Sequence, residues 1–207
     1  MIAHLICGSP HLCLPSHLAG YIVGVDRGAL KLIEKKVEFG VAIGDFDSVS
    51  VLERQLIEEK VKLVLELPTN KDVTDCEAAV AHVVEKGYRQ IYLYGVTGAR
   101  FDHQFAVIGL MLKYAKQAVQ IYMEDMQIKI FFLTPGSHQI EGASKKYISF
   151  FAYEEMVKSL TLQGVKYPLD GYDLAVDDSL CVSNEALSPT IGISFDKGYL
   201  LVVQSSD

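Results

Sequence analysis

The feature that most constrains the fold is an alternation of short apolar runs with amphipathic stretches over the first 123 residues. The runs are rich in Val, Ile, Leu and Tyr and mostly lack polar alternation, as expected of strands covered on both faces. Apolar residues at helical spacing lie between them, so the alternation predicts an open, Rossmann-like parallel sheet with helices on both faces. The expected strands are 4–7, 21–25, 41–43, 61–67, 90–94 and 119–123, and the expected helices are 30–37, 52–59, 73–84 and about 102–116.

The pattern changes after about residue 124, where no helical period appears. Turn signals such as Pro135-Gly136 and Asp170-Gly171 separate five further runs that are typical of strands. These expected strands are 127–133, 146–152, 157–162, 191–195 and 199–204. We therefore predict two domains, a parallel α/β domain over residues 1–124 and an antiparallel β-sandwich domain over residues 125–207.

The charge balance limits the kinds of partner. With 19 Lys and Arg against 26 Asp and Glu, the formal net charge is −7. A general nucleic-acid-binding protein needs a basic face to replace phosphate counterions, so we expect no nucleic-acid partner. A nucleotide whose phosphates are screened by a divalent metal is compatible with this charge.

The N-terminal segment and the cysteines indicate in which cellular compartment the protein is expected. Residues 1–25 contain no Asp, Glu, Lys or Arg, but they lack the basic start of a signal peptide. Pro10 and Pro15 in this segment also argue against a membrane span. Four cysteines without short pairwise spacing indicate neither a zinc knuckle nor a disulfide framework. We expect a cytoplasmic protein with no membrane partner.

Polar residues gather where four of the expected strands end. In an open α/β sheet, ligands bind outside the carboxyl ends of the strands, so these junctions predict one site rather than four separate loops. The four segments are Asp26-Arg27-Gly28, 44–48, 68–75 and 95–103.

Asp45 and Asp47 are the candidate metal ligands of the second segment. They are two residues apart, so in extended backbone their carboxylates point to the same side. Two hard oxygen ligands with room for water and phosphate oxygens suit Mg²⁺. An Asp-rich turn with Ser48 as the N-cap of the next helix explains the same residues equally well. Together with the other junctions, the metal site is favoured.

The third segment combines a helix cap with further carboxylates. Thr74 and Glu77 have the spacing of a capping box, which is the preferred interpretation of both. Asp72 and Asp75 lie near the same helix N-terminus, where the helix dipole favours carboxylates without any other function. The expected position of Asp75 beside the Asp45 segment favours a functional role for it.

Gly95, Gly98 and Arg100 precede the last expected helix of the first domain. Glycines let the backbone approach phosphate, the helix N-terminus offers free amides, and Arg100 adds a forked donor. By itself the segment is more typical of a glycine-rich turn with a surface arginine. Two roles are open for Asp102, as helix cap or as the group that orients Arg100. We expect His103 to pack or to hydrogen-bond to Asp102 rather than to act as a general base.

These segments resemble the motifs of the thiamine pyrophosphokinase (thiamine diphosphokinase) family, in the same order and over nearly the whole chain. The family motifs Asp-x-Gly, Gly-Asp-Phe-Asp-Ser, Lys-Asp-x-Thr-Asp and Gly-x-x-Gly-Gly-Arg-x-Asp-His match residues 26–28, 44–48, 71–75 and 95–103. Ala99, Phe105 and Val107 depart from the family pattern in and just beyond the last block. In the second domain, residues 164–169 and 183–185 resemble the family's thiamine-binding domain.

The resemblance implies transfer of the pyrophosphoryl group of ATP, the co-substrate, to the thiamine hydroxyl, giving thiamine diphosphate and AMP. It implies Mg²⁺ as the cofactor, and a homodimer whose active site lies at the subunit interface. In these terms residues 1–124 form the ATP- and Mg-binding catalytic domain, and residues 125–207 form the thiamine-binding domain.

The matched positions carry over the family's site residues. Asp45, Asp47 and Asp75 would bind Mg²⁺ and, with Arg100, form the catalytic set. Ser183 and Asn184 would lie near thiamine. The residues expected around ATP and its phosphates are Asp26, Gly28, Lys71, Asp72, Thr74, Gly98, Arg100, Asp102 and His103.

Two further roles are hypotheses from the chemistry of this reaction. The thiamine hydroxyl is a weak nucleophile, and Asp47 is the hypothesis for the group that accepts its proton. The thiazolium ring is cationic and aromatic faces attract cations, which makes Tyr167 the stacking candidate. Simple packing of Tyr167 in a strand is an equal alternative.

Two other functions remain open. The Asp45-x-Asp47 pair would also suit a metal-dependent nucleotide-sugar transferase, whose acidic motif likewise follows a strand. A non-catalytic sensor that binds thiamine or a nucleotide is the second alternative, and the retained metal ligands speak against it. Detection of pyrophosphoryl transfer to thiamine would separate these functions.

Overall fold

The computed structural model of the chain describes residues 1–10, 12–70, 72–98, 100–142 and 144–207. It divides into two compact units, Met1–Asp125 and Met126–Asp207. Lys71 and Ala99, both singled out by their motifs, lie outside the described residues. None of the helices in the described ranges is long and apolar enough to cross a membrane.

The first unit contains a six-stranded parallel sheet in the order β4-β3-β2-β1-β5-β6. The order runs outward from β1 to β4 on one side and continues with β5 and β6 on the other. The strand order therefore reverses between β1 and β5, which is the topological switch point where ligands bind in such sheets. The strands are β1 (Ile2–Ile6), β2 (Tyr21–Val25), β3 (Val41–Gly44), β4 (Leu63–Glu66), β5 (Gln90–Tyr94) and β6 (Gln120–Glu124).

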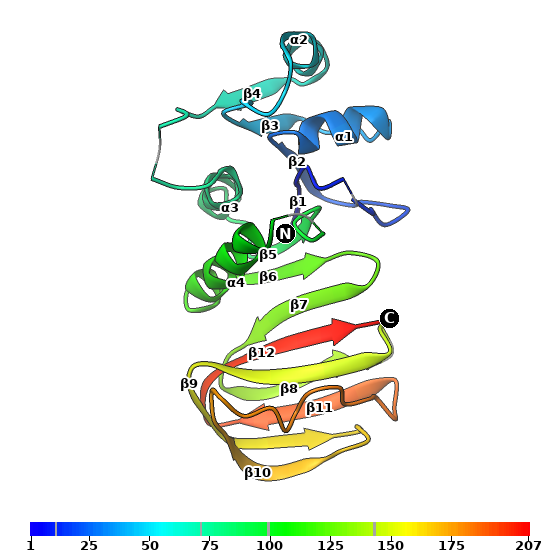
Figure 1. The fold of residues 1–207 in the computed structure, drawn as a ribbon, viewed down its shortest axis with the longest axis vertical. Helices are drawn as coiled ribbons and strands as arrows, with labels where there is room; N and C mark the ends of the chain where they lie inside the picture. Colours follow the sequence, from blue (N-terminus) through cyan, green and yellow to red (C-terminus); the bar gives the residue numbers. More distant parts are fainter. Residues whose placement is uncertain (11, 71, 99, 143) are drawn as a thin grey trace. The chain divides into compact units, whose positions relative to one another are not determined.

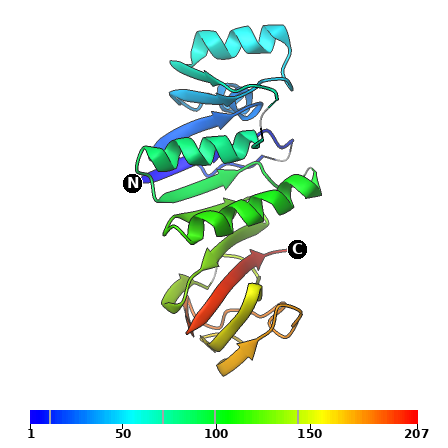
Figure 2. The same cartoon turned by 90° about the vertical axis from the view of Figure 1, so that its left-hand side faces the viewer.

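Four helices flank this sheet: α1 (Gly28–Glu34), α2 (Val51–Lys60), α3 (Asp75–Glu85) and α4 (Phe101–Ala115). Helix α1 lies on one side of the sheet and α3 and α4 lie on the other (Figure 1), with α3 and α4 side by side across its face (Figure 2). Apolar residues of α1, β3 and α2 form one buried cluster, which includes Ala29, Ala42 and Ile57. The predicted parallel sheet with helices on both faces is confirmed.

Local capping explains where two of these helices begin. The Ser50 hydroxyl accepts the Glu53 backbone N–H, and the Glu53 carboxylate accepts the Ser50 N–H, a complete capping box for α2. Ser48, weighed as this cap, is therefore not the N-cap. At α3 the Thr74 hydroxyl accepts the Glu77 N–H at 3.1 Å, which confirms the Thr74 half of the predicted capping box, whereas the Glu77 carboxylate accepts from Lys113 Nζ at 2.8 Å.

The second unit is antiparallel, as predicted, with the strand order β7-β12-β9-β11-β8 and with β10 paired to β9. The first part of β9 pairs with β12, and its last part pairs with β10 and β11. The two strands expected at 146–152 and 157–162 are thus one long strand. The strands are β7 (Ile128–Leu133), β8 (Gly136–Glu141), β9 (Tyr147–Gln163), β10 (Leu169–Leu174), β11 (Thr190–Phe195) and β12 (Lys197–Ser205).

Strands β8 and β10 were missed for a physical reason. Their sequences, GSHQIE and LDGYDL, are polar, and most of their residues are exposed or half-buried. Strands held by backbone ladder bonds to a neighbour need no apolar run of their own. Periodicity therefore fails to predict strands of this kind.

Candidate functional site

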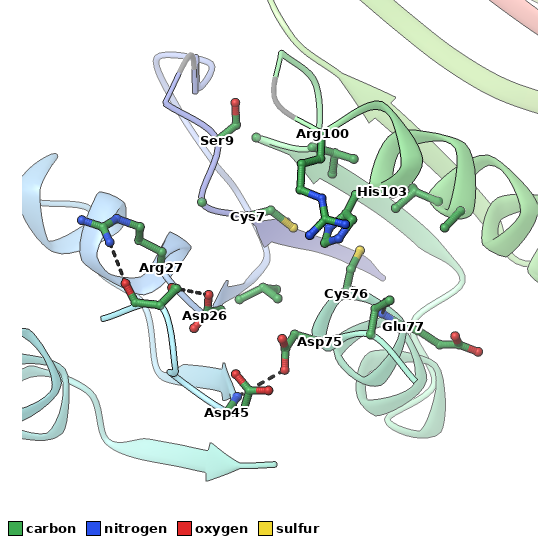
Figure 3. Close-up of a pocket in the computed structure, with 18 of the residues that line it drawn as sticks. Cys7, Ser9, Asp26, Arg27, Asp45, Asp75, Cys76, Glu77, Arg100 and His103 are labelled. Atoms are coloured by element: carbon green, nitrogen blue, oxygen red, sulfur yellow. Dashed lines mark hydrogen bonds between the residues drawn. The ribbon is translucent and has the colours of Figure 1, made fainter. Parts of the chain in front are cut away.

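A cleft of about 640 Å³ opens at the carboxyl ends of the strands in the first unit. It is lined by residues that follow β1, β2, β3 and β5 and by the first residues of α3 and α4. The structure thus brings the four predicted junctions together beside the switch point between β1 and β5. In Figure 3, Arg100 and His103 approach the cleft from one side, and Asp26 and Asp45 approach it from the other.

Three carboxylates form a group in this cleft that could hold a metal ion. One oxygen each of Asp26, Asp45 and Asp47 lies within 4.8 Å of the others. Asp26 is the unexpected member, since the sequence placed it with the nucleotide. Asp75 lies beside the group, and its carboxylate accepts the backbone N–H of Asp45 at 3.2 Å.

The backbone around this group is unusual. Asp26 has φ 48° and Phe46 has φ 56°, in the left-handed region that non-glycine residues rarely adopt. Strain of this kind persists where the surrounding structure enforces it, and it clusters at functional sites. Asp26 directly follows β2 and Phe46 lies two residues after β3, so the left-handed backbone turns the chain where these two strands end.

The electrostatics of the group favour a cation. The negative charge of Asp45 is the first cause that raises the pKa of Asp47, followed by desolvation and by the charge of Asp26. Like charges held this close disfavour each other's ionised form, and a bound cation would reverse that effect.

One atom in particular fits a metal ligand. In the part of the chain that the structure describes, Asp26 Oδ1 is buried and has no hydrogen-bond partner. Its other oxygen, Oδ2, accepts the Ser48 hydroxyl at 2.6 Å. A buried carboxylate oxygen without a partner is costly, and a hard cation with oxygen ligands would satisfy it. The residues present therefore fit a divalent cation such as Mg²⁺.

Ser48 and Arg27 hold this arrangement. Arg27 Nη1 donates to the Ser48 carbonyl at 2.7 Å, and Arg27 Nη2 reaches Glu53 at 3.5 Å. Ser48 in turn fixes the Asp26 carboxylate. Sequence reasoning missed both roles, although both residues belong to the motifs that it singled out.

Gly28 is needed for the packing of α1 against β1, not for contact with a ligand. A Cβ at this position would approach the Ile6 carbonyl oxygen to 1.8 Å, so only glycine lets α1 begin against β1. Gly28 is buried and is not among the described residues that line the cleft. Gly95 does line the cleft, with φ 69°, and a Cβ there would meet the Cys7 carbonyl oxygen at 2.4 Å.

Arg100 and His103 reach the cleft from the start of α4. Both ends of the Arg100 guanidinium contact the Asp102 carboxylate, with Nε to Oδ1 at 3.2 Å. This bond is the first cause that lowers the pKa of Asp102, which favours the orienting role over the cap. Of the two alternatives expected for His103, packing or a hydrogen bond to Asp102, the structure shows the second for the backbone N–H, whereas the side chain is exposed.

The remaining first-unit candidates are less closely tied to the cleft. Thr74 lines it and also caps α3. Asp72 and Gly98 are exposed and are not among the described lining residues. Lining residues that the sequence reasoning missed include Cys7 and Ser9, because the end of β1 carries no charged motif, and Cys76, whose helical spacing is that of a core residue.

In the second unit, Tyr167, Ser183 and Asn184 lie together. The buried Asn184 side chain accepts the Tyr167 N–H at 3.0 Å and donates to the Tyr167 carbonyl at 2.8 Å. Ser183 has φ 58° and donates its N–H to Ser149 Oγ at 2.9 Å. Tyr167 is 59% exposed and lies outside the strands, so the alternative that it packs in a strand is wrong.

Comparison with known protein families identifies the family of this chain. Residues 16–123 match the model described as the catalytic domain of thiamin pyrophosphokinase, and residues 137–200 match the model of its vitamin B1 binding domain. The chain belongs to the thiamine pyrophosphokinase family. The resemblance read from the motifs is confirmed.

Individual members of the family agree with this assignment. The chain is 35% identical to the thiamine pyrophosphokinase of Bacillus subtilis over 211 residues, which covers 99% of this chain and 98% of the relative. A solved thiamin pyrophosphokinase family protein of Enterococcus faecalis superposes with a TM-score of 0.92 at 32% identity, with full coverage of both chains. The solved enzyme of Geobacillus thermodenitrificans gives 0.88 at 35% identity, covering 100% of this chain and 98% of that one.

Proposed function

We propose that the protein transfers the pyrophosphoryl group of ATP to the thiamine hydroxyl, giving thiamine diphosphate and AMP. The observation that carries the proposal is the cleft itself, in which a carboxylate group with an unpartnered Asp26 oxygen faces Arg100. Pyrophosphoryl transfer needs little covalent chemistry from a protein, only positioning and neutralisation of phosphate charge. The family supports this reaction over the nucleotide-sugar transferase and the sensor.

Asp45, Asp47 and Asp75 are the proposed Mg²⁺ ligands, and the structure adds Asp26 as a candidate. When bound, Mg²⁺ would offset the negative charge that builds on the phosphate oxygens. The chain's own part is to hold these carboxylates in place, through the Ser48 hydroxyl on Asp26 and the Asp45 backbone N–H on Asp75.

Arg100 is the proposed phosphate-binding cation. Asp102 accepts from Nε and Nη2 of Arg100 and so orients the guanidinium fork beside the cleft. Lys71 stays a prediction from its motif. The N-terminus of α4 has no side-chain cap, and its first backbone N–H groups lie at the same side of the cleft as further donors.

Asp47 is the proposed acceptor of the hydroxyl proton. It is exposed in the structure, so the substrate hydroxyl can reach its carboxylate. Asp47→Asn with near-normal turnover at saturating Mg²⁺ would contradict this role.

Thiamine recognition is proposed for the second unit. The exposed Tyr167 ring offers a face for the thiazolium cation, and Asn184 fixes the backbone that carries it. The proposed homodimer would form the active site at the subunit interface. The four cysteines are free, which supports a reducing, cytoplasmic setting.

A turnover assay with thiamine, ATP and Mg²⁺ tests the proposal. We expect AMP and thiamine diphosphate in equal amounts, and loss of both products in Asp45→Asn, because that variant removes a metal ligand. Glu59→Gln, which removes an exposed carboxylate on α2, is the matched control and should keep full activity. Thiamine binding without product would favour the sensor instead.

A further inference from the structure

Two thiols lie on the wall of the cleft and have no part in the proposed reaction. Cys7 follows the end of β1, and Cys76 is in the first turn of α3. Both line the cleft, and their sulfur atoms point into the same space in Figure 3. Neither cysteine is in a disulfide.

The two thiols interact directly. A side-chain hydrogen bond with Cys76 is the first cause that raises the pKa of Cys7 well above its ordinary value. Burial raises the pKa further, as do the negative charges of Asp26 and Asp75. A thiol kept protonated in this way attacks peroxides and disulfides slowly, which argues against a redox switch.

Metal coordination places different demands on the pair. A thiophilic cation displaces thiol protons outright, so a raised pKa weakens binding without preventing it. Thiolates select soft and borderline ions over Mg²⁺. The two thiolates come from different elements and face the same part of the cleft, so one divalent ion can bind both and neutralise their two charges, whereas a monovalent ion would leave a net negative charge.

We propose that Cys7 and Cys76 form a binding site for a thiophilic divalent cation of the Zn²⁺ class, distinct from the carboxylate group of Asp26, Asp45 and Asp47. Two S–H bonds break, two sulfur–metal bonds form, and both protons go to solvent with no change of oxidation state. Water completes the coordination. The cleft then contains a hard site and a soft site next to each other.

Cd²⁺ is the probe that reports the soft site, since its bond to thiolate absorbs in the ultraviolet by charge transfer. The full-length, reduced, metal-free protein is titrated with Cd²⁺, and then Zn²⁺ is added to displace it. We expect one thiolate-bound Cd²⁺ per chain. Cys7→Ser and Cys76→Ser should each weaken binding at least about tenfold, as loss of a group that supports a metal site does.

Cys13→Ser is the matched control, because this thiol is in the same unit but is not among the described residues that line the cleft. It should leave the Cd²⁺ signal unchanged. Asp47→Asn should lower Mg²⁺ binding and keep the Cd²⁺–thiolate signal, which separates this inference from the proposed reaction. Cys76→Ser keeps the test valid if Cys7→Ser fails to fold, since Cys76 is only half-buried and serine is close to cysteine in size.

Two results would overturn the proposal. One is a thiolate signal that survives in both Cys7→Ser and Cys76→Ser. The other is a signal lost in Asp47→Asn and retained in the cysteine variants, which would place the metal on the carboxylates alone.

Discussion

The two units assemble their candidate residues in different ways. In the first unit, residues from five separate segments meet because parallel strands all end at the same edge, with the switch point leaving room between β1 and β5. In the second unit, Tyr167 and Asn184 meet through two hydrogen bonds between a side chain and the backbone. Topology gathers the first site, whereas individual side-chain bonds gather the second.

This difference affects what a substitution does. Arg100, whose side chain is exposed at this end of the parallel sheet, can be replaced without leaving buried groups unpaired, so its loss should act on chemistry more than on folding. The buried Asn184 side chain pairs both the N–H and the carbonyl of Tyr167, so its loss leaves these backbone groups unpaired. The following predictions test that contrast.

The largest effect is expected at Arg100, at the edge of the parallel sheet. Arg100→Ala should lower kcat by about 100-fold, the typical cost of removing one preorganised donor to a developing charge. The kcat of Arg100→Lys should lie between those of the parent and Arg100→Ala, because lysine keeps the positive charge but lacks the forked pair of donors. Steady-state kinetics with ATP as the varied substrate measure both, and the unfolding temperature should stay unchanged.

Lys60→Ala is the control for Arg100, since it removes an exposed positive charge from α2 of the same unit. An Arg100→Lys variant as active as the parent would show that the fork is not used.

The next effect concerns the exposed ring of the second unit. Tyr167→Ala should weaken thiamine binding by roughly 30-fold, if stacking of a desolvated cation is worth about 2 kcal/mol. Tyr167→Phe keeps the aromatic face and should bind thiamine nearly as well as the parent. Equilibrium binding of thiamine measures both variants, and an equal loss in Phe and Ala would exclude stacking.

Ser48 and Ser50 form a matched pair two residues apart. Ser48→Ala frees the Asp26 carboxylate and should weaken Mg²⁺ binding about tenfold, as loss of a group that orients a ligand does. Ser50→Ala removes the cap of α2 and should instead cost about 1 kcal/mol of stability. Mg²⁺ titration and chemical unfolding are measured for both variants. We expect Ser48→Ala to change mainly Mg²⁺ affinity and Ser50→Ala to change mainly stability.

The smallest effect is a pH dependence of stability at His4. Burial lowers the pKa of His4, against smaller opposing effects of the Ala19 carbonyl and Glu124. Below about pH 6.5 the unfolded chain takes up a proton that the folded chain resists, so stability falls as the pH is lowered and levels off below the folded pKa.

Urea unfolding between pH 7 and pH 5 should therefore show a flatter pH slope in His4→Gln than in the parent. His17→Gln, at an exposed histidine, should keep the parental slope. If the His4→Gln slope matches that of the parent, another group is responsible for the dependence.

Much of the first unit could be predicted because its signals are local. Helical spacing, apolar runs and the Thr74 cap are read from neighbouring residues, and a parallel sheet then places the ends of its strands at one edge. Strands β8 and β10 could not be predicted, because their backbone bonds are with distant partners and their own residues are polar.

By itself, the sequence determined the fold class, the family and the edge of the sheet where the chemistry lies, because motif spacing and periodicity depend on contiguous residues. Only the tertiary structure decided that Asp26 joins Asp45 and Asp47, that Ser48 holds a carboxylate rather than caps a helix, and that Cys7 faces Cys76. Those pairings join residues from different strands and helices. Their distances depend on how the elements pack together, which no local pattern encodes.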